Sequence, residues 1–364
     1  MDLAFGRDEL IVERGRAEDV LAATAARQED VLRITQDRID GLLEHQKSTD
    51  LGFEVVMTLF IFSLPFLADA ETEPWCVYRS KMRVFVTGGS GFVGSFLVRE
   101  LLARGHELTL LTRDPCRVTG WGVDVVEGSL TDFDPERLRG HHALIHNAIV
   151  WEDEHRLDDV RLSLRLFHAA LECGVERAIF TSSTAVHRPY RALMNEDTPL
   201  RPSDVYGATK AASETMLWTS KLPGDVVRAG PVVCAPAFKG APFKAERRVA
   251  ELFRAARANE DLRIRRDEGL QCIAGVDLAK VYAALLDRDP GGQTFIATSA
   301  DFITWEEIAR EALELTSSTS RVLVDTSDPQ HARFDVSKLD RELSLRFAVS
   351  GRANFFIAAY AHAT

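Results

Sequence analysis

Short apolar segments alternate with amphipathic segments from residue 82 to about residue 230. Arg83 to Val86 is rich in β-branched and aromatic residues, which predicts a buried parallel strand. Further strands are predicted at residues 106–112, 123–127, 143–148, 177–182 and 225–229, and helices at residues 95–104, 160–173 and 204–220. Because parallel neighbours require a crossover connection, this alternation predicts the α/β class, with a doubly wound parallel sheet.

The start of the chain does not share this pattern. Residues 16–46 have the apolar spacing of an amphipathic helix, whereas the apolar run of residues 55–67 is too short to span a bilayer comfortably. Charged residues from Arg7 onward argue against a signal peptide. We predict that residues 1–81 form an atypical N-terminal extension, weakly ordered or partly helical, that the chemistry does not need. A membrane tether at residues 55–67 is the alternative.

A glycine-rich turn follows the first predicted strand. The segment Thr87 to Gly94, TGGSGFVG, separates this strand from a predicted helix. Glycines at 88, 91 and 94 permit a tight turn, close approach of the backbone to a pyrophosphate, and close packing of helix on strand. The helix N-terminus offers N–H groups and a positive dipole end to phosphates. Strand, turn and helix together predict a Rossmann-type dinucleotide-binding domain.

Beyond residue 230 the chain contains more loops. Pro231, Pro236, Gly240 and Pro242 mark these loops, and a helix at residues 244–258 and strand-like segments at residues 262–264 and 294–297 follow. We predict an NAD(P)-binding Rossmann domain over residues 82–230. Residues 231–364 are expected to form a smaller, mixed, substrate-binding lobe, with some return of the chain to the first domain.

Composition and charge limit the classes of partner that the protein is expected to bind. The 364-residue chain has a net charge of -11, so no basic excess is available to neutralise phosphates, and we expect no nucleic-acid partner. The five cysteines are scattered and odd in number, which indicates a reducing, cytoplasmic location. His141 and His142 lack metal-ligand partners at suitable spacing, so no metal site is expected. The expected partners are a small-molecule substrate and, as an open alternative, a second copy of the chain in a homodimer; no stable membrane association is expected.

The end of the second predicted strand bears on the choice of cofactor. An acidic residue there would bind a ribose 2′-hydroxyl, whereas an arginine suits a 2′-phosphate. The sequence has Arg113 followed by Asp114. Arg113 favours NADP, because a guanidinium binds phosphate well and also stacks on adenine. NAD stays an alternative, since Asp114 could take a hydroxyl, and so does a solvated Arg–Asp turn with no ligand.

A second group of residues suggests proton transfer. Tyr206 and Lys210 are spaced i,i+4, which places them on one face of a predicted helix. A nearby ammonium, together with the positive nicotinamide ring, would favour the phenolate and make proton exchange with a substrate hydroxyl feasible. Ser183, at the end of the fifth predicted strand, could orient the substrate oxygen, because open α/β sheets place ligands at the carboxyl ends of their strands. We therefore predict Ser183, Tyr206 and Lys210 as catalytic residues.

From Met82 onward the chain resembles an extended short-chain dehydrogenase/reductase of the NAD(P)-dependent epimerase/dehydratase family. The matching segments are residues 87–94, 145–148 and 181–186, the spaced residues Glu196, Pro199, Pro202, Tyr206, Gly207, Lys210 and Glu214, and residues 227–231 and 276–279. The resemblance covers nearly all of residues 82–345. It implies a Rossmann domain with a substrate lobe, bound NAD(P), and Ser183, Tyr206 and Lys210 as the active triad.

Cofactor and substrate contacts follow from these motifs and from the resemblance. The expected cofactor-binding residues are Thr87, Gly88, Gly91, Phe92, Val93, Gly94, Arg113, Ser129, Leu130, Asn147, Ala148, Tyr206 and Lys210. The expected substrate-binding residues are Trp151, Ser183, His187 and Arg188. For Trp151 the alternative is a cover over the edge of the core, and for His187 and Arg188 it is an ordinary loop role.

Departures from the family pattern make a standard nucleotide-sugar epimerase less certain. Gly128-Ser129 stands where Gly-Asp is usual, and His187-Arg188 where Tyr-Gly is frequent. We predict an NAD(P)-dependent oxidoreductase or epimerase/dehydratase that acts on a hydroxyl or carbonyl of a small polar substrate, with sugar derivatives as one candidate class. The alternative is an NADP-binding redox sensor or scaffold without turnover.

Overall fold

The computed structural model describes residues 81–150, 156–326 and 332–348. Contacts within the chain divide it into two units, Met1–Val77 and Tyr78–Thr364, and every described residue belongs to the second unit. The predicted extension over residues 1–81 thus lies outside the described residues, apart from Lys81. Within those ranges no helix combines the length and the apolar character that crossing a bilayer requires.

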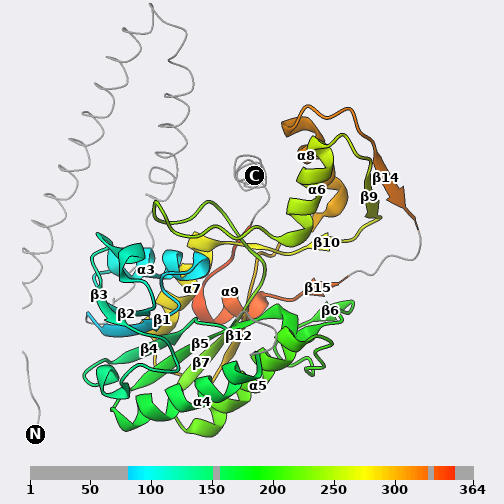
Figure 1. Cartoon of the computed structure of the whole chain (residues 1–364). Coiled ribbons are helices and arrows are strands. Elements are labelled where there is room, and N and C mark those ends of the chain that lie inside the picture. Colours follow the sequence, from blue (N-terminus) through cyan, green and yellow to red (C-terminus); the bar gives the residue numbers. More distant parts are fainter. Residues whose placement is uncertain (1–80, 151–155, 327–331, 349–364) are drawn as a thin grey trace, which may run out of the picture. The chain divides into compact units, whose positions relative to one another are not determined.

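A seven-stranded sheet forms the centre of the second unit (Figure 1). Its strands are β1 (Arg83–Thr87), β2 (Glu107–Thr112), β3 (Asp124–Glu127), β4 (Ala143–His146), β5 (Arg177–Ser183), β7 (Gly224–Ala229) and β12 (Thr294–Ala297). Their order in space is β12-β7-β5-β4-β1-β2-β3, and every neighbouring pair is parallel. The chain runs outward from β1 to β3 and then continues on the other side with β4. The carboxyl ends of β1 and β4 therefore form a topological switch point, where such sheets bind ligands. The predicted doubly wound α/β fold is confirmed.

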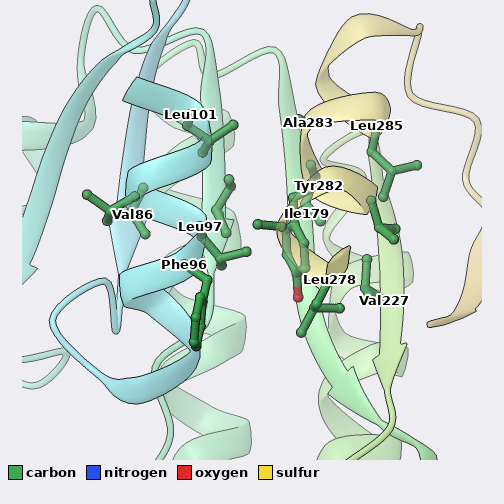
Figure 2. Close-up of a cluster of buried hydrophobic side chains, with 14 of the residues drawn as sticks. Val86, Phe96, Leu97, Leu101, Ile179, Val227, Leu278, Tyr282, Ala283 and Leu285 are labelled. Carbon is green, nitrogen blue, oxygen red and sulfur yellow. The ribbon is translucent and has the colours of Figure 1, made fainter. Parts of the chain in front are cut away.

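Helices cover both faces of this sheet. They are α3 (Phe92–Ala103) and α7 (Gly275–Asp287) on one face, and α4 (Arg156–Glu172) and α5 (Val205–Ser220) on the other. Because successive side chains of a strand point to opposite faces, Val84 and Val86 of β1 pack with α3 and α7, whereas Phe85 packs with α4 and α5. Figure 2 shows the first of these clusters, which includes Leu97 of α3 and Tyr282 of α7. Two apolar layers thus hold the sheet in place.

The later part of the chain contributes to the sheet and to a smaller lobe. The remaining elements are β6 (Leu193–Met194), β8 (Val232–Val233), α6 (Arg247–Arg257), β9 (Leu262–Arg265), β10 (Gly269–Leu270), β11 (Ile273–Ala274), β13 (Ile303–Thr304), α8 (Trp305–Leu315), β14 (Val322–Asp325), β15 (Arg333–Phe334) and α9 (Ser337–Leu343). Helices α6 and α8 pack with β9 and β14 around a separate apolar cluster that includes Phe253 and Ile308. Strand β12 and helix α7 instead complete the sheet layers. The division between residues 82–230 and 231–364 stays a prediction.

Candidate active site

The glycine turn joins β1 to α3 with little free space around its backbone. Gly88 has φ +71°, a left-handed conformation that favours glycine, and a Cβ there would lie 2.6 Å from the amide nitrogen of Ala148. A Cβ on Gly94 would lie 2.1 Å from the Gly88 carbonyl oxygen. Gly91 is the N-cap of α3 and makes no side-chain capping bond. The turn therefore presents bare backbone at a helix N-terminus, which fits the diphosphate of a dinucleotide.

A buried hydrogen-bond chain connects this turn to β4 and α4. The Thr87 hydroxyl is 2.8 Å from His146 Nδ1, His146 Nε2 is 2.9 Å from Ser163 Oγ, and Ser163 Oγ donates to the Asp159 carbonyl at 2.7 Å. Because the single hydroxyl proton of Ser163 goes to Asp159, His146 must donate through Nε2 and accept from Thr87 through Nδ1. Burial, with a smaller effect of Lys210, lowers the pKa of His146 to about 3, so the ring stays neutral.

Asn147 and Ala148, at the end of β4, contact the glycine turn directly. Asn147 Nδ2 donates to the Gly88 carbonyl at 3.1 Å, and the Ala148 amide donates to Thr87 Oγ1 at 3.3 Å. The structure therefore brings two predicted cofactor residues that follow β4 against the predicted cofactor turn. His146 and Ser163 were not among the predicted site residues. Only the matched segment 145–148 pointed to that region of the sequence.

The end of β2 lies beside the glycine turn. Ser90 Oγ is 3.1 Å from Thr112 Oγ1, and the exposed Arg113 follows directly. The Asp114 carboxylate accepts from the Cys116 amide at 3.1 Å and caps a short helix (Pro115–Val118). It also pairs with Arg117 at 3.3 Å. Asp114 is therefore engaged in local structure, whereas Arg113 is exposed directly after β2, beside the glycine turn.

The other predicted residues near adenine lie after β3. Ser129 Oγ donates to Asp132 Oδ1 at 2.8 Å and its amide donates to the same oxygen at 2.6 Å. Leu130 is buried in the cluster that contains Phe85. Ser129 thus shapes a turn, and Leu130 extends the apolar layer beside it.

Ser183, Tyr206 and Lys210 come together at the carboxyl end of β5. Ser183 is the last residue of β5, Tyr206 is the second residue of α5, and Lys210 follows one turn later. Tyr206 lies near enough to Ser183 for the serine side chain to lower its pKa. Lys210 Nζ donates to the Thr181 carbonyl at 3.0 Å and lies 4.9 Å from the centre of the Phe180 ring. The expected grouping of serine, tyrosine and lysine is present in the geometry.

Two local features hold the start of α5 against β5. Asp204 is the N-cap of α5 and accepts from the Gly207 amide at 2.8 Å. A Cβ on Gly207 would lie 2.5 Å from the Ala185 carbonyl oxygen, so only glycine allows the helix to approach this closely. Ala185 belongs to a short helix (Thr184–His187) that follows Ser183. The close approach brings Tyr206 within reach of Ser183.

Burial shifts the ionisation of Tyr206 and Lys210 in opposite directions. It raises the pKa of Tyr206, although the nearby Ser183 side chain and the Arg188 guanidinium lower it. It lowers the pKa of Lys210, although the carboxylates of Asp159 and Glu214 raise it. Burial thus favours the neutral phenol of Tyr206, and the predicted activation by the nicotinamide ring stays a prediction.

His187 and Arg188 occupy different environments. His187 is buried, its Nε2 lies 3.3 Å from Arg228 Nη1, and burial lowers its pKa to about 4. Arg188 is exposed, and its Nη1 forms an ion pair with Oδ2 of Asp204 at 3.0 Å. Its charge also acts on Tyr206. Arg188 thus faces the site, His187 lies within a polar cluster behind it, and the substrate contacts of both stay predictions. Trp151 lies outside the described residues.

A buried ion pair supports the site from behind. Arg228 of β7 donates to Glu214 of α5 through Nη2 at 2.8 Å and through Nε at 3.1 Å. Glu214 also accepts from Ser182, the residue before Ser183. Both charged side chains are almost fully buried. Glu214 and Arg228 appear among the family landmarks in the sequence, but nothing in their spacing of fourteen residues identified them as a pair.

The described residues contain no group of three or more His, Cys, Asp or Glu side chains placed to hold a metal ion. The model of the NAD dependent epimerase/dehydratase family matches residues 84–296, which include most of β1, the glycine turn, Ser183, Tyr206 and Lys210. The chain belongs to this family. The expected family membership is confirmed.

Curated relatives in sequence include several oxidoreductases. A 3 beta-hydroxysteroid dehydrogenase/Delta 5-->4-isomerase of Mycobacterium tuberculosis is 32% identical over 151 residues, which are 36% of this chain and 41% of the relative. A 4-hydroxy-2-methyl-3-oxo-4-farnesyl-3,4-dihydroquinoline-1-oxide ketoreductase of Stigmatella aurantiaca is 28% identical over 303 residues, 72% of this chain and 88% of the relative. The chain spans about two fifths of the length of the first curated relatives it matches.

Solved structures share the fold of this enzyme. The UDP-glucose 4-epimerase of Thermotoga maritima, solved with UDP-glucose, superposes with a TM-score of 0.63 at 17% identity, and the match covers 77% of this chain and 98% of that one. The Bordetella bronchiseptica enzyme WbmG, solved in complex with NAD, gives a TM-score of 0.63 at 22% identity and covers 77% and 94%. At such identities the likeness concerns the fold alone.

Proposed function

We propose that this family member is an NAD(P)-dependent oxidoreductase or epimerase/dehydratase that acts at a hydroxyl or carbonyl of a small polar substrate, with Ser183, Tyr206 and Lys210 as its catalytic residues. The observation that supports the proposal best is the bond from Lys210 Nζ to the Thr181 carbonyl at 3.0 Å, which places the lysine of α5 against the carboxyl end of β5, where Ser183 lies. Lys210 lies one helical turn from Tyr206. Sugar derivatives are one candidate substrate class, because the similar Thermotoga maritima enzyme is a UDP-glucose 4-epimerase.

The residues around the glycine turn fit a dinucleotide. Thr87, Gly88, Gly91, Phe92, Val93 and Gly94 would bind its diphosphate, Arg113, Ser129 and Leu130 its adenosine end, and Asn147, Ala148, Tyr206 and Lys210 its nicotinamide end. When bound, the nicotinamide supplies a hydride acceptor or donor. Tyr206 would exchange a proton with the substrate oxygen, and Ser183 would orient that oxygen by a hydrogen bond. Lys210 would hold the ribose and stabilise the phenolate as it forms.

Replacing Tyr206 by phenylalanine tests this assignment. We expect Tyr206→Phe to lower turnover by about 10²–10⁴-fold, since general acid–base catalysis supplies an effect of that size, and to leave cofactor affinity nearly unchanged. Turnover is measured by product chromatography with a panel of nucleotide sugars, ketones and secondary alcohols and each nicotinamide cofactor. Near-normal turnover in the variant would remove Tyr206 from the mechanism. Cofactor binding with no turnover of any substrate by the natural enzyme would favour the redox-sensor or scaffold alternative.

We propose NADP rather than NAD as the preferred cofactor, on the evidence of Arg113. Asp114 is occupied as a helix cap, whereas Arg113 is exposed beside the glycine turn. Arg113→Ala should weaken NADP binding by about tenfold, the value of one charge-assisted contact, and change NAD binding little. Isothermal titration with both cofactors measures the two affinities. An equal loss for both, or a natural preference for NAD such as WbmG would suggest, contradicts the proposal.

We also propose a cellular location, on the evidence of the cysteines. Cys116, Cys173, Cys234 and Cys272 are free thiols, which fits a reducing, cytoplasmic location. A homodimer stays an open alternative to a monomer.

A further inference from the structure

The segment from Cys234 to Phe243 joins two parts of the fold. It begins directly after β8 and leads, through the N-cap Glu246, into α6 of the smaller lobe (Figure 1). Its apolar side chains pack against the buried cluster that includes Phe96 and Leu97 of α3. We call residues 234–243 the strap, because they cross from the sheet to the smaller lobe while they stay in contact with α3.

The middle of the strap is held against α3 and the loop before β3. The Phe238 ring stacks on the Trp121 ring, with the ring centres 4.1 Å apart and the planes at 12°. Trp121 is itself buried. Arg99 Nη1 of α3 donates to the Ala237 carbonyl at 3.4 Å. Because stacked aromatic rings attract each other beyond the area that they bury, the Phe238–Trp121 pair stabilises the strap in this closed position.

The far end of the strap lies beside the proposed diphosphate site. The Phe243 ring meets the Phe92 ring edge-on, with the ring centres 5.6 Å apart and the planes at 80°. Phe92 is the first residue of α3 and directly follows Gly91, the N-cap. A diphosphate bound by the N–H groups at this end of α3 would therefore lie next to the residue that the strap contacts.

The start of the strap has a strained backbone. Cys234 has φ +129°, a conformation that residues with a side chain rarely adopt. Its side chain is buried in the cluster that contains α3, so packing holds the strained conformation in place. Aromatic contacts thus stabilise the closed strap, whereas strain at Cys234 destabilises it. A small change in either would shift the balance between closed and open positions.

We propose that the strap is a gate for the nicotinamide cofactor: it lifts from α3 about Cys234 to admit or release the dinucleotide, and the Trp121–Phe238 stack holds it closed. This inference rests on the proposed dinucleotide site at the glycine turn. The stack closes the strap in the free and in the cofactor-bound protein alike. Weakening it therefore raises the rates of cofactor association and dissociation by the same factor and leaves the affinity nearly unchanged. Loss of a direct cofactor contact would instead raise mainly the dissociation rate.

Phe238→Leu tests the gate, because leucine keeps an apolar side chain but cannot stack on Trp121. Lys239→Ala is the matched control, since Lys239 is the exposed neighbour of Phe238. Stopped-flow nicotinamide fluorescence measures the association of NADPH and of NADH with each full-length protein, and displacement by excess oxidised cofactor measures dissociation. We expect both rate constants to rise about two- to tenfold in Phe238→Leu, the effect of losing one aromatic pair, and to keep their natural values in Lys239→Ala.

Cys234→Gly should have the opposite effect. Glycine adopts φ +129° without strain, so the closed strap gains stability and both rate constants should fall about two- to tenfold. This variant also decides the question if Phe238→Leu does not fold. A rise in dissociation alone in Phe238→Leu, equal rises in Lys239→Ala, or faster exchange of cofactor in Cys234→Gly would overturn the proposal.

The reactivity of Cys234 follows the strap without any cofactor. Cys234 and Cys173 are each 7% exposed, and Cys173 packs in the cluster on the other face of the sheet. N-ethylmaleimide labelling, quantified for each cysteine by mass spectrometry, should be about two- to tenfold faster at Cys234 in Phe238→Leu and unchanged at Cys173. Unchanged labelling of Cys234 overturns the gate. If neither NADPH nor NADH binds the natural protein, the proposed function fails, whereas the labelling still shows whether the strap opens.

Discussion

At the scale of single residues, the structure turns a family landmark into a defined chemical group. His146 is completely enclosed between Thr87 and Ser163: the Ser163 hydroxyl donates to Asp159, which requires a proton on Nε2, and burial lowers the pKa of the ring to about 3. A charged imidazole is disfavoured there, because burial removes the water that would solvate its charge. The glycine turn therefore depends on a histidine that stays neutral.

This neutrality makes stability depend on pH. The pKa of His146 falls from 6.5 to about 3 on folding, so between these values the unfolded chain binds the extra proton and stability rises with pH. The stabilisation is fully present above about pH 6.5 and is lost as pH falls towards 3. We expect the natural protein to lose about 2 kcal/mol between pH 7 and pH 5 that His146→Asn does not lose. Urea unfolding of both proteins at the two pH values measures the difference, and an identical pH dependence would contradict it.

At the scale of elements, α5 is held by contacts on either side of the turn that carries Tyr206 and Lys210. Gly207 allows the helix to touch Ala185, and Glu214, one turn beyond Lys210, binds Arg228 of β7 and Ser182 of β5. A helix positioned at only one end could rotate and carry Tyr206 away from Ser183. The ion pair thus fixes the face of α5 that meets the sheet.

A double-mutant cycle measures how strongly Glu214 and Arg228 stabilise each other. Glu214→Gln leaves the Arg228 guanidinium buried without a counter-ion, and we expect a loss of about 3–5 kcal/mol in the free energy of unfolding. Combining Glu214→Leu with Arg228→Met removes both charges, and this double variant should lose less than the sum of the two single changes. Urea unfolding of the natural protein, Glu214→Leu, Arg228→Met and the double variant gives the coupling free energy. Additive losses would show that the two side chains act independently.

At the scale of the whole molecule, the unit Tyr78–Thr364, called the sheet unit below, builds its seven-stranded sheet from segments that lie far apart in the sequence. Tyr282 of α7 and Phe295 of β12 lie in the same buried cluster as Val86 of β1. The sheet therefore depends on residues far beyond 230, whereas contacts assign residues 1–77 to a separate unit.

Two truncations test this organisation. A chain that begins at Tyr78 keeps every element of the sheet unit, and we expect it to melt within about 3 °C of the full chain and to bind cofactor equally well. A chain restricted to residues 82–230 lacks α7 and β12 and should fail to unfold cooperatively, because part of its core is missing. Calorimetry and cofactor titration distinguish these outcomes. Lost cofactor binding in a folded chain that begins at Tyr78 would show that residues 1–77 contribute to the site.

The amino-acid sequence by itself determined what depends on near neighbours along the chain. Strand periodicity, the glycine spacing at residues 88–94 and the i,i+4 spacing of Tyr206 and Lys210 all operate within a few residues. The sheet strands could therefore be predicted, and residues for a catalytic role could be proposed. The predicted strand at residues 143–148 ends at His146, because Asn147 and Ala148 turn towards Gly88.

Only the tertiary structure decided how charges are arranged around that triad. Arg228 reaches Glu214 from another strand, and burial raises the pKa of Tyr206 while it lowers that of Lys210. The ionisation of a buried group depends on which side chains surround it and on how completely they exclude water. Both are set by the packing of segments distant in sequence, so no local pattern of residues records them.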